Sequence, residues 1–187
     1  VDATGGCNRA TTLQNLRNVP FAVFIGGQDT TRAPSAKEGI EAIKALRSAD
    51  PDGYESAYNE YPDMGHGLKS KALTDINAYL KDKVRRSYPR KVVWYPEVAW
   101  KRRFYNLAIE APLLGQSVVA EMGQDNVVTV KSDKIPALTL YLNDALVNLD
   151  KEVQVVWNGE KVFSGRLSRR LTVVLEPSTG IKLEFVL

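Results

Sequence analysis

Apolar and polar residues follow two different patterns along the chain, and the pattern changes near residue 88. Before that point, strand-like segments alternate with segments whose apolar residues recur at helical spacing, which predicts right-handed βα crossovers. After it, short β-rich segments are separated by turns, which is typical of a β-sandwich. We therefore expect an α/β domain at residues 1–87 and an all-β sandwich domain at residues 88–187.

The first part contains one near-continuous apolar run, Pro20–Ile25, which suits a strand covered on both faces, as in a parallel sheet. Ser35 and Glu38 have the spacing of a capping box and predict a helix that begins there. Residues 54–61 predict a shorter second strand, and residues 70–86 a second long helix. Its expected apolar face consists of Leu73, Ile76, Leu80 and Val84.

The first twelve residues carry two weaker signals. Thr11 or Thr12 is placed to cap a short helix through Leu13 and Leu16. Cys7 is the only cysteine, which excludes an internal disulfide framework. We interpret its thiol as inert rather than nucleophilic, because nothing nearby in the sequence would lower its pKa.

The second part contains nine candidate strands, each bounded by turn residues. They are Lys91–Tyr95, Phe104–Glu110, Ser117–Met122, Val127–Lys131, Leu138–Leu142, Val153–Trp157, Lys161–Phe163, Leu171–Leu175 and Lys182–Val186. Asn158-Gly159 predicts a type I′ hairpin turn, because both residues tolerate a positive φ. An aromatic group at Trp94, Tyr95, Trp100, Phe104 and Tyr105 either packs at a domain junction or lines a ligand face, and packing is the commoner role.

Composition narrows the range of partners. With 44% apolar and 25% charged residues, the chain has the composition of a folded soluble protein. No apolar run approaches the ~20 residues of a membrane span. The net charge of +3 is spread evenly, and the denser basic stretches at 81–91 and 101–103 are interpreted as solvated faces rather than a nucleic-acid stripe. We expect neither a membrane nor a nucleic-acid partner.

Two loops carry the candidate chemistry. Asp29 follows the apolar run and two glycines, and His66, the only histidine, follows the second strand between two more glycines. If the two strands are parallel neighbours, both side chains emerge at one edge of the sheet. A carboxylate fixes the tautomer of an imidazole and stabilises its cation. The alternatives are a turn role for Asp29 and a turn role for His66 beside Asp63. We expect no metal or organic cofactor.

The segments "VPFAVFIGGQDTTRAPSAKEGIEAIKAL" and "YNEYPDMGHGL" resemble the last two sheet strands of α/β-hydrolases, in the branch that includes dienelactone hydrolase and prolyl oligopeptidase. The resemblance covers about residues 10–86. It implies that Asp29 is the triad acid and His66 the triad base of a serine hydrolase that cleaves a small ester or peptide substrate. The β-rich part resembles the C-terminal extension of some bacterial members.

One departure from this family is large, because no G-x-S-x-G nucleophile motif occurs in the chain. The chain also begins at Val1 without a methionine. We therefore expect an excised fragment that is inactive alone. Its expected partner is the missing N-terminal part of the hydrolase, or a second copy that pairs at the exposed edge of the strand at residues 21–25.

The alternative function is a non-catalytic binding or interaction module formed by the β-rich part. No nucleophile motif is required for that role, and about half of the residues belong to this part. The compartment is left open, with a secreted or periplasmic parent as one option.

Overall fold

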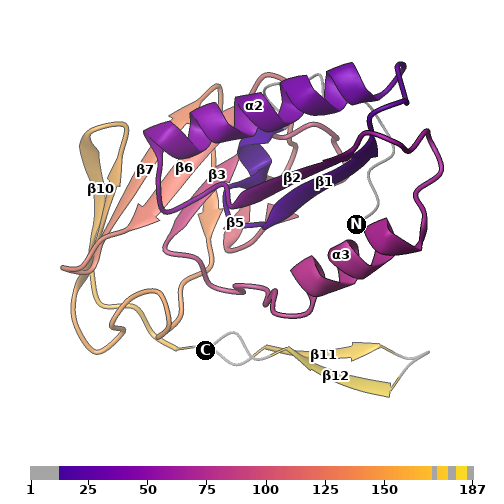
Figure 1. Ribbon diagram of the computed structural model, residues 1–187. Helices are drawn as coiled ribbons and strands as arrows, with labels where there is room; N and C mark the ends of the chain where they lie inside the picture. The colour runs from indigo at the N-terminus through magenta and orange to yellow at the C-terminus, as the bar shows by residue number, and fades with distance from the viewer. Residues whose placement is uncertain (1–12, 170–171, 177–179, 185–187) are drawn as a thin grey trace. The chain divides into compact units, whose positions relative to one another are not determined.

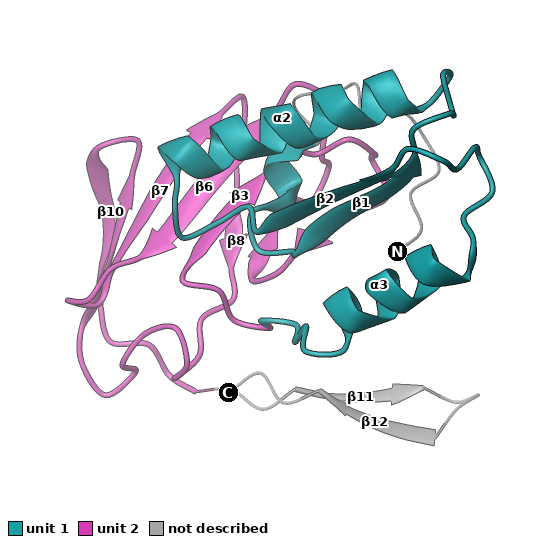
Figure 2. Cartoon of the chain, viewed as in Figure 1, with its two compact units in different colours: residues 1–86 teal, residues 87–187 magenta. Residues whose placement is uncertain are grey.

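The structure is a computed structural model that describes residues 13–169, 172–176 and 180–184 (Figure 1). The chain divides into two compact units, residues 1–86 and residues 87–187 (Figure 2). Thr11, Thr12 and Cys7 lie outside the described residues, as does the end of the last candidate strand. Among the described helices, none combines the length and the hydropathy needed to cross a membrane.

From residue 13 onward, where the structure describes it, the first unit contains two parallel strands and two α-helices. In chain order its elements are the 3-10 helix η1 (Gln14–Leu16), β1 (Phe21–Gly26), α2 (Ala33–Ala49), β2 (Ser56–Tyr61) and α3 (Ser70–Leu80). Strands β1 and β2 pair in parallel, with Phe21 opposite Ser56 and Gly26 opposite Tyr61. The parallel pairing predicted from the sequence is confirmed.

Helices α2 and α3 lie on opposite sides of the β1–β2 pair (Figure 1). Successive side chains of a strand point to opposite faces. Phe21 accordingly packs on the cluster that contains Ile43 of α2, whereas Phe24 meets Tyr79 of α3 in an edge contact with 6.1 Å between ring centroids. The Tyr79 hydroxyl also donates to the Phe21 carbonyl, at 3.3 Å. The apolar run of β1 thus packs side chains against both helices.

The start of α2 and the end of α3 differ from the prediction. Helix α2 begins at Ala33, with Pro34 in its first turn, and not at Ser35. Proline has a fixed φ suited to the first helical turn, and this outweighs the predicted capping box. Helix α3 ends at Leu80, before the predicted end at residue 86, and three residues of its predicted apolar face are exposed: Leu73 by 55%, Leu80 by 51% and Val84 by 81%.

The described residues of the second unit form three sheets. Its elements are β3 (Lys91–Trp94), β4 (Arg103–Phe104), β5 (Leu107–Ala108), β6 (Ser117–Met122), β7 (Val127–Asp133), β8 (Thr139–Leu140), β9 (Val153–Trp157), β10 (Glu160–Gly165), β11 (Thr172–Glu176) and β12 (Gly180–Glu184). The largest sheet has the order β10-β9-β7-β6-β3, and the others are β4-β5-β8 and the pair β11-β12. The pairing of β7 with β9 is parallel and the other pairings are antiparallel.

Alternation along β6 and β7 forms the core of this unit. Val118, Ala120 and Met122 of β6 are buried with Val128 and Val130 of β7, while the residues between them are partly or fully exposed. These side chains share one cluster with aromatic and aliphatic residues of the sheet β4-β5-β8. The period of two therefore sets which face of the large sheet is buried.

Two turn assignments have different outcomes. The predicted hairpin at Asn158-Gly159 is confirmed, since both residues have positive φ, 49° and 91°, between the antiparallel strands β9 and β10. The single strand predicted at Phe104–Glu110 is instead the hairpin β4–β5, which turns at Tyr105, where φ is 51°. No glycine marks that turn, so it could not be predicted from turn residues.

The predicted fold class, a partial α/β-hydrolase followed by an all-β sandwich, is wrong. The described residues are mostly strands in mixed and antiparallel sheets, and their two α-helices contain 17 and 11 residues. Two strands are too few to form the multi-stranded parallel sheet that the α/β class implies. The largest sheet of the second unit is mixed, whereas the expected sandwich consists of antiparallel sheets. A β-rich class describes this chain.

Candidate acid–base site

The loops that follow β1 and β2 leave the sheet at the same edge, because the two strands are parallel. Backbone hydrogen bonds join the loops directly. Gly27 N–H donates to the Tyr61 carbonyl at 2.8 Å, and Gln28 N–H donates to the Met64 carbonyl at 2.9 Å. The position of one loop is therefore tied to that of the other.

Gly26 permits this close approach. A Cβ atom at Gly26 would lie 2.1 Å from the Gly65 carbonyl oxygen and 2.3 Å from the Met64 carbonyl oxygen. Both distances are far shorter than any normal contact, so a larger residue would push the second loop away. Glycine at the end of β1 is needed here for space rather than for an unusual φ.

Tyr61 anchors the second loop to α3. Its hydroxyl donates to Asp75 Oδ2 at 2.8 Å. Burial, this hydrogen bond and the charge of Asp75 raise the pKa of Tyr61 to about 12, so the hydroxyl remains a donor at neutral pH. The carbonyl that receives the Gly27 bond is therefore held in place by a neighbouring helix.

Asp29 and His66 are in direct contact at this edge. Asp29 Oδ2 lies 2.9 Å from His66 Nδ1. The other carboxylate oxygen, Oδ1, accepts a hydrogen bond at 3.1 Å from the backbone N–H of Arg32, the N-cap residue of α2. The structure thus brings together the two residues that the sequence predicted as an acid–base pair.

The surroundings of Asp29 favour its ionised form. Burial raises the pKa of this carboxyl, but the hydrogen bonds from His66 and the Arg32 N–H and the charges of both residues outweigh that effect, so the pKa lies below its ordinary value of 3.8. The guanidinium Nη1 of Arg32 lies 3.7 Å from Asp29 Oδ2. The start of α2 adds a partial positive charge on the same side. Asp29 is therefore an anion at neutral pH.

An ionised carboxylate only accepts hydrogen bonds, so Nδ1 of His66 must carry the proton. The other ring nitrogen, Nε2, then has a free lone pair when the ring is neutral. The Asp29 side chain is 6% exposed and that of His66 is 64% exposed. A buried anion thus orients an accessible imidazole, an arrangement that can take a proton from a hydroxyl and stabilise the resulting imidazolium.

The contacts of His66 bear on the alternative that it is a turn residue paired with Asp63. His66 Nδ1 is bonded to Asp29 and not to Asp63, its closer neighbour in the sequence. The glycines on either side of His66 have no positive φ, and a Cβ at Gly65 or Gly67 would meet no atom within 4 Å. Neither glycine is therefore required by an unusual φ or by a close contact.

Arg32 also belongs to this site, although its sequence pattern did not predict it. The residue is three positions after Asp29 and contributes both a backbone donor and a nearby positive charge. Asp29 accepts from the N-cap residue of α2, so this bond depends on where the helix begins, and the sequence predicted that start two residues later, at Ser35.

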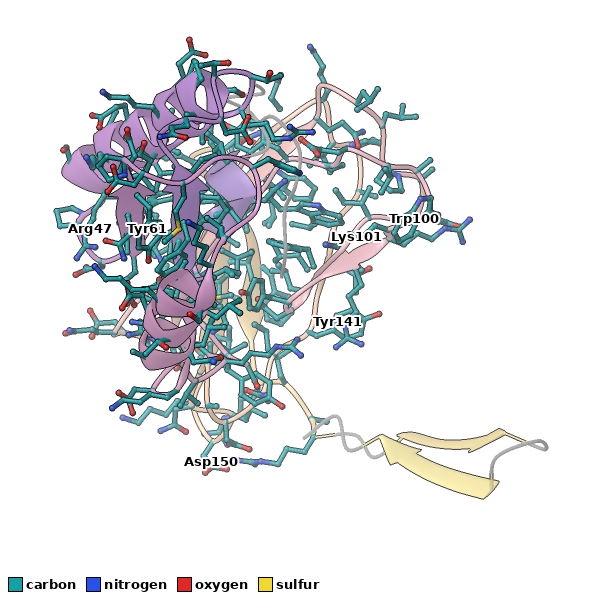
Figure 3. All side chains as sticks on the ribbon, turned by 45° about the vertical axis from the view of Figure 1, so that its right-hand side comes forward. Arg47, Tyr61, Trp100, Lys101, Tyr141 and Asp150 are labelled. Carbon is teal, nitrogen blue, oxygen red and sulfur yellow. The ribbon has the colours of Figure 1, made fainter. Side chains whose placement is uncertain are left out.

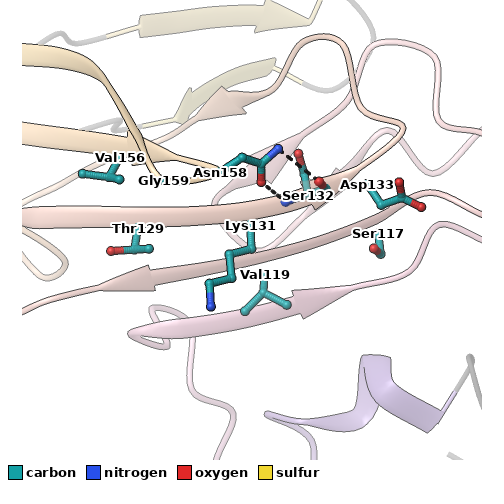
Figure 4. Close-up of a pocket in the computed structure, with 9 residues that line it drawn as sticks. All are labelled: Ser117, Val119, Thr129, Lys131, Ser132, Asp133, Val156, Asn158 and Gly159. Carbon is teal, nitrogen blue, oxygen red and sulfur yellow. Dashed lines mark hydrogen bonds between the residues drawn. The ribbon is translucent and has the colours of Figure 1, made fainter.

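The second unit has a hollow on its large sheet with a volume of about 540 Å³ (Figure 4). It is lined by Ser117, Val119, Thr129, Lys131, Ser132, Asp133, Val156, Asn158 and Gly159. Ser132 N–H donates to Asn158 Oδ1 and Asn158 Nδ2 donates back to the Ser132 carbonyl, at 2.9 and 3.2 Å. The accessible surface of the hollow is mainly apolar, and its lining also includes the charged residues Lys131 and Asp133.

Within the part of the chain that the structure describes, no three His, Cys, Asp or Glu side chains are grouped closely enough to hold a metal ion. The chain matches no protein family, and no curated protein and no solved structure shows significant similarity to it.

Proposed function

We propose that Asp29 and His66 are the acid and the general base of a serine hydrolase that cleaves ester or peptide bonds. Asp29 orients the imidazole and stabilises its cation, and His66 Nε2 accepts the proton of a serine hydroxyl. The serine belongs to a part of the protein outside this sequence. The same imidazolium then donates that proton to the leaving group.

One observation carries the proposal: the 2.9 Å contact between a buried carboxylate and the Nδ1 of an exposed histidine. A turn histidine satisfied by a local carboxylate would require a nearer partner such as Asp63. The sequence order of acid loop, helix, strand and histidine loop adds support, because it resembles that of α/β-hydrolases.

The missing nucleophile limits what this chain does alone. No G-x-S-x-G motif is present, and a triad without its nucleophile loses on the order of 10⁶-fold in rate. Activity is therefore expected of the parent protein, and its substrate is proposed to be a small ester or peptide.

The test uses the parent protein that contains this sequence. We expect hydrolysis of p-nitrophenyl acetate, with kcat lowered about 10⁶-fold in His66→Ala and about 10⁴-fold in Asp29→Asn. The matched control is Asp63→Asn, which removes a carboxylate three residues from His66 that does not contact the ring, and it should retain activity within a few-fold. Activity that ignores His66→Ala contradicts the proposal.

A second measurement locates the nucleophile. A fluorophosphonate probe should label one serine of the parent protein, and that serine should lie outside the 187 residues of this sequence. Labelling should fail in His66→Ala, because the serine is then not activated. Labelling of a serine within this chain would contradict the assignment.

A further inference from the structure

Trp100 is the most exposed aromatic residue described in the second unit, whereas its aromatic neighbours are packed. Trp94 is 2% exposed and stacks on Phe104, with ring centroids 5.8 Å apart, and Phe104 meets Tyr105 edge-on at 4.9 Å. Trp100 is 79% exposed. Packing therefore accounts for the other aromatics but leaves Trp100 without a structural role, and leaving an indole in water forgoes a large burial free energy.

Three consecutive cations follow Trp100 in the chain. Lys101, Arg102 and Arg103 are all exposed, and none of them forms an ion pair with any residue that the structure describes. The nearest acidic residues along the connected segments are Glu97 and Glu110. The positive charge is thus locally uncompensated, in a chain whose overall charge is only +3.

Two of these cations rest on aromatic rings. Lys101 Nζ lies 4.8 Å from the ring centroid of Phe104, and the Arg103 guanidinium lies 4.3 Å from that of Tyr141. Such contacts hold a long side chain at a fixed place, which lowers the entropy lost when it binds a partner. Figure 3 shows Trp100, Lys101 and Tyr141 on one side of this unit.

We propose that Trp100, Lys101, Arg102, Arg103 and Tyr141, here called the Trp100 strip, bind an acidic segment of a protein partner. Exposed tryptophan, tyrosine and arginine are the residue types that dominate binding energy in protein interfaces. The cations pair with the partner's carboxylates, and guanidinium groups do so in two-pronged fashion. This goes beyond the proposed hydrolase function and does not depend on it.

The test titrates the full chain with a peptide of ten glutamates and follows tryptophan fluorescence. The peptide has no aromatic residue, so the signal comes from the protein. We expect a saturable blue shift as Trp100 loses water, and weaker binding at higher salt. A peptide of ten serines should give no shift. Absence of a saturable shift with the glutamate peptide overturns the proposal.

Variants assign the binding to the strip. Lys101→Ala/Arg103→Ala should weaken binding of the glutamate peptide at least about tenfold. The control Lys151→Ala/Arg166→Ala removes two exposed cations elsewhere in the same unit and should leave the affinity within about twofold. Equal losses in the two double variants would show unspecific charge attraction and overturn the proposal. Arg102→Glu tests the charge separately, because the Arg102 side chain rests on neither the Phe104 nor the Tyr141 ring. This variant should abolish the fluorescence shift caused by the glutamate peptide.

A third arm separates protein from polysaccharide partners. Polygalacturonate offers carboxylates on sugar rings, and we expect it to bind more weakly than the glutamate peptide. Tighter binding of polygalacturonate would overturn the assignment to a protein segment.

Discussion

At the scale of single residues, Asp29 has two oxygens with different partners. One faces the His66 ring at 2.9 Å and the other accepts from the backbone at the start of α2 at 3.1 Å. Replacement by asparagine keeps the shape but presents only one acceptor oxygen. If that oxygen keeps the bond from the Arg32 N–H, the amide Nδ2 faces His66 Nδ1, and the neutral ring must then carry its proton on Nε2. The carboxylate therefore links the fold of the helix to the orientation of the imidazole.

This linkage predicts how stability depends on pH. The folded-state pKa of Asp29 lies below its ordinary value of 3.8, so ionised Asp29 stabilises the fold above the unfolded-state pKa. The stabilisation is lost as pH falls through the folded-state pKa, because the unfolded chain binds a proton first. Urea unfolding followed by circular dichroism should show Asp29→Asn less stable than wild type at about pH 5, with the difference shrinking at about pH 3. A difference that grows on acidification would contradict this sign.

Asp29 and His66 could be predicted because each follows an apolar or alternating strand and precedes a helix, so the chain order alone placed them at one edge. The contribution of Arg32 could not, because it depends on where α2 begins. Trp100 could not be separated from the packed aromatics either, since exposure depends on contacts between segments far apart in the sequence.

At the scale of elements, the close approach of the end of β1 to the loop after β2 sets the geometry of the site. The Cβ clash at Gly26 is with backbone atoms, which cannot rotate away as a side chain does. Helix α2 begins where the loop after β1 ends. Helix α3 holds the start of the loop after β2, because the Tyr61 hydroxyl donates to Asp75 of α3. The positions of Asp29 and His66 are consequences of these contacts.

We predict that Gly26→Ala destabilises the fold by about 1–3 kcal/mol, because a methyl group there displaces the carbonyls of Met64 and Gly65. Chemical denaturation gives the free energy of unfolding. The matched control is Gly65→Ala, in the same loop, where a methyl group meets no atom within 4 Å and the change should stay within about 0.5 kcal/mol. Equal effects of the two substitutions would contradict the close approach.

At the scale of the whole molecule, the two units carry different spectroscopic reporters. All three tryptophans, Trp94, Trp100 and Trp157, belong to the second unit, and both α-helices described here belong to the first. The buried cluster of the second unit is much the larger of the two, and burial of apolar surface is the main stabilising contribution. The second unit is therefore expected to be the more stable.

Thermal unfolding tests this difference. Loss of helical circular dichroism should occur at a lower temperature than the change in tryptophan fluorescence, because the two signals report different units. Coincident transitions would mean that the chain unfolds as one cooperative unit and would contradict the prediction.

A second prediction at this scale concerns the outer edge of β1. Phe21 N–H donates to the Glu55 carbonyl at 2.9 Å, on the β2 side, so the backbone groups of Ala22 and Phe24 point away from β2. No described strand pairs with that edge. We propose that this edge accepts a strand from a second copy of this chain.

Light scattering should therefore show association of this chain that increases with concentration. Ala22→Pro removes an outward-facing donor without breaking a bond to β2, and it should reduce that association. A strictly monomeric 20.8 kDa species at all concentrations would argue against an open edge.

The fold class was the least predictable property. Alternation at residues 20–86 indicated parallel βα units correctly, but it could not show that only two strands would pair. Strand spacing beyond residue 88 indicated a β-rich unit, yet the parallel pairing of β7 with β9 joins segments separated by about twenty residues. Such pairings follow from packing of the whole unit, which periodicity does not encode.

The most direct test of the acid–base pair is the tautomer of His66, which nuclear magnetic resonance can read without assignment because the chain contains one histidine. Long-range ¹H–¹⁵N correlation at about pH 8, well above the ~6.5 at which an ordinary histidine titrates, should show a protonated Nδ1 and an unprotonated Nε2. In Asp29→Asn this preference should be lost. A ring protonated at Nε2 in the wild type, and unchanged in Asp29→Asn, would contradict the pair on which the proposed function depends.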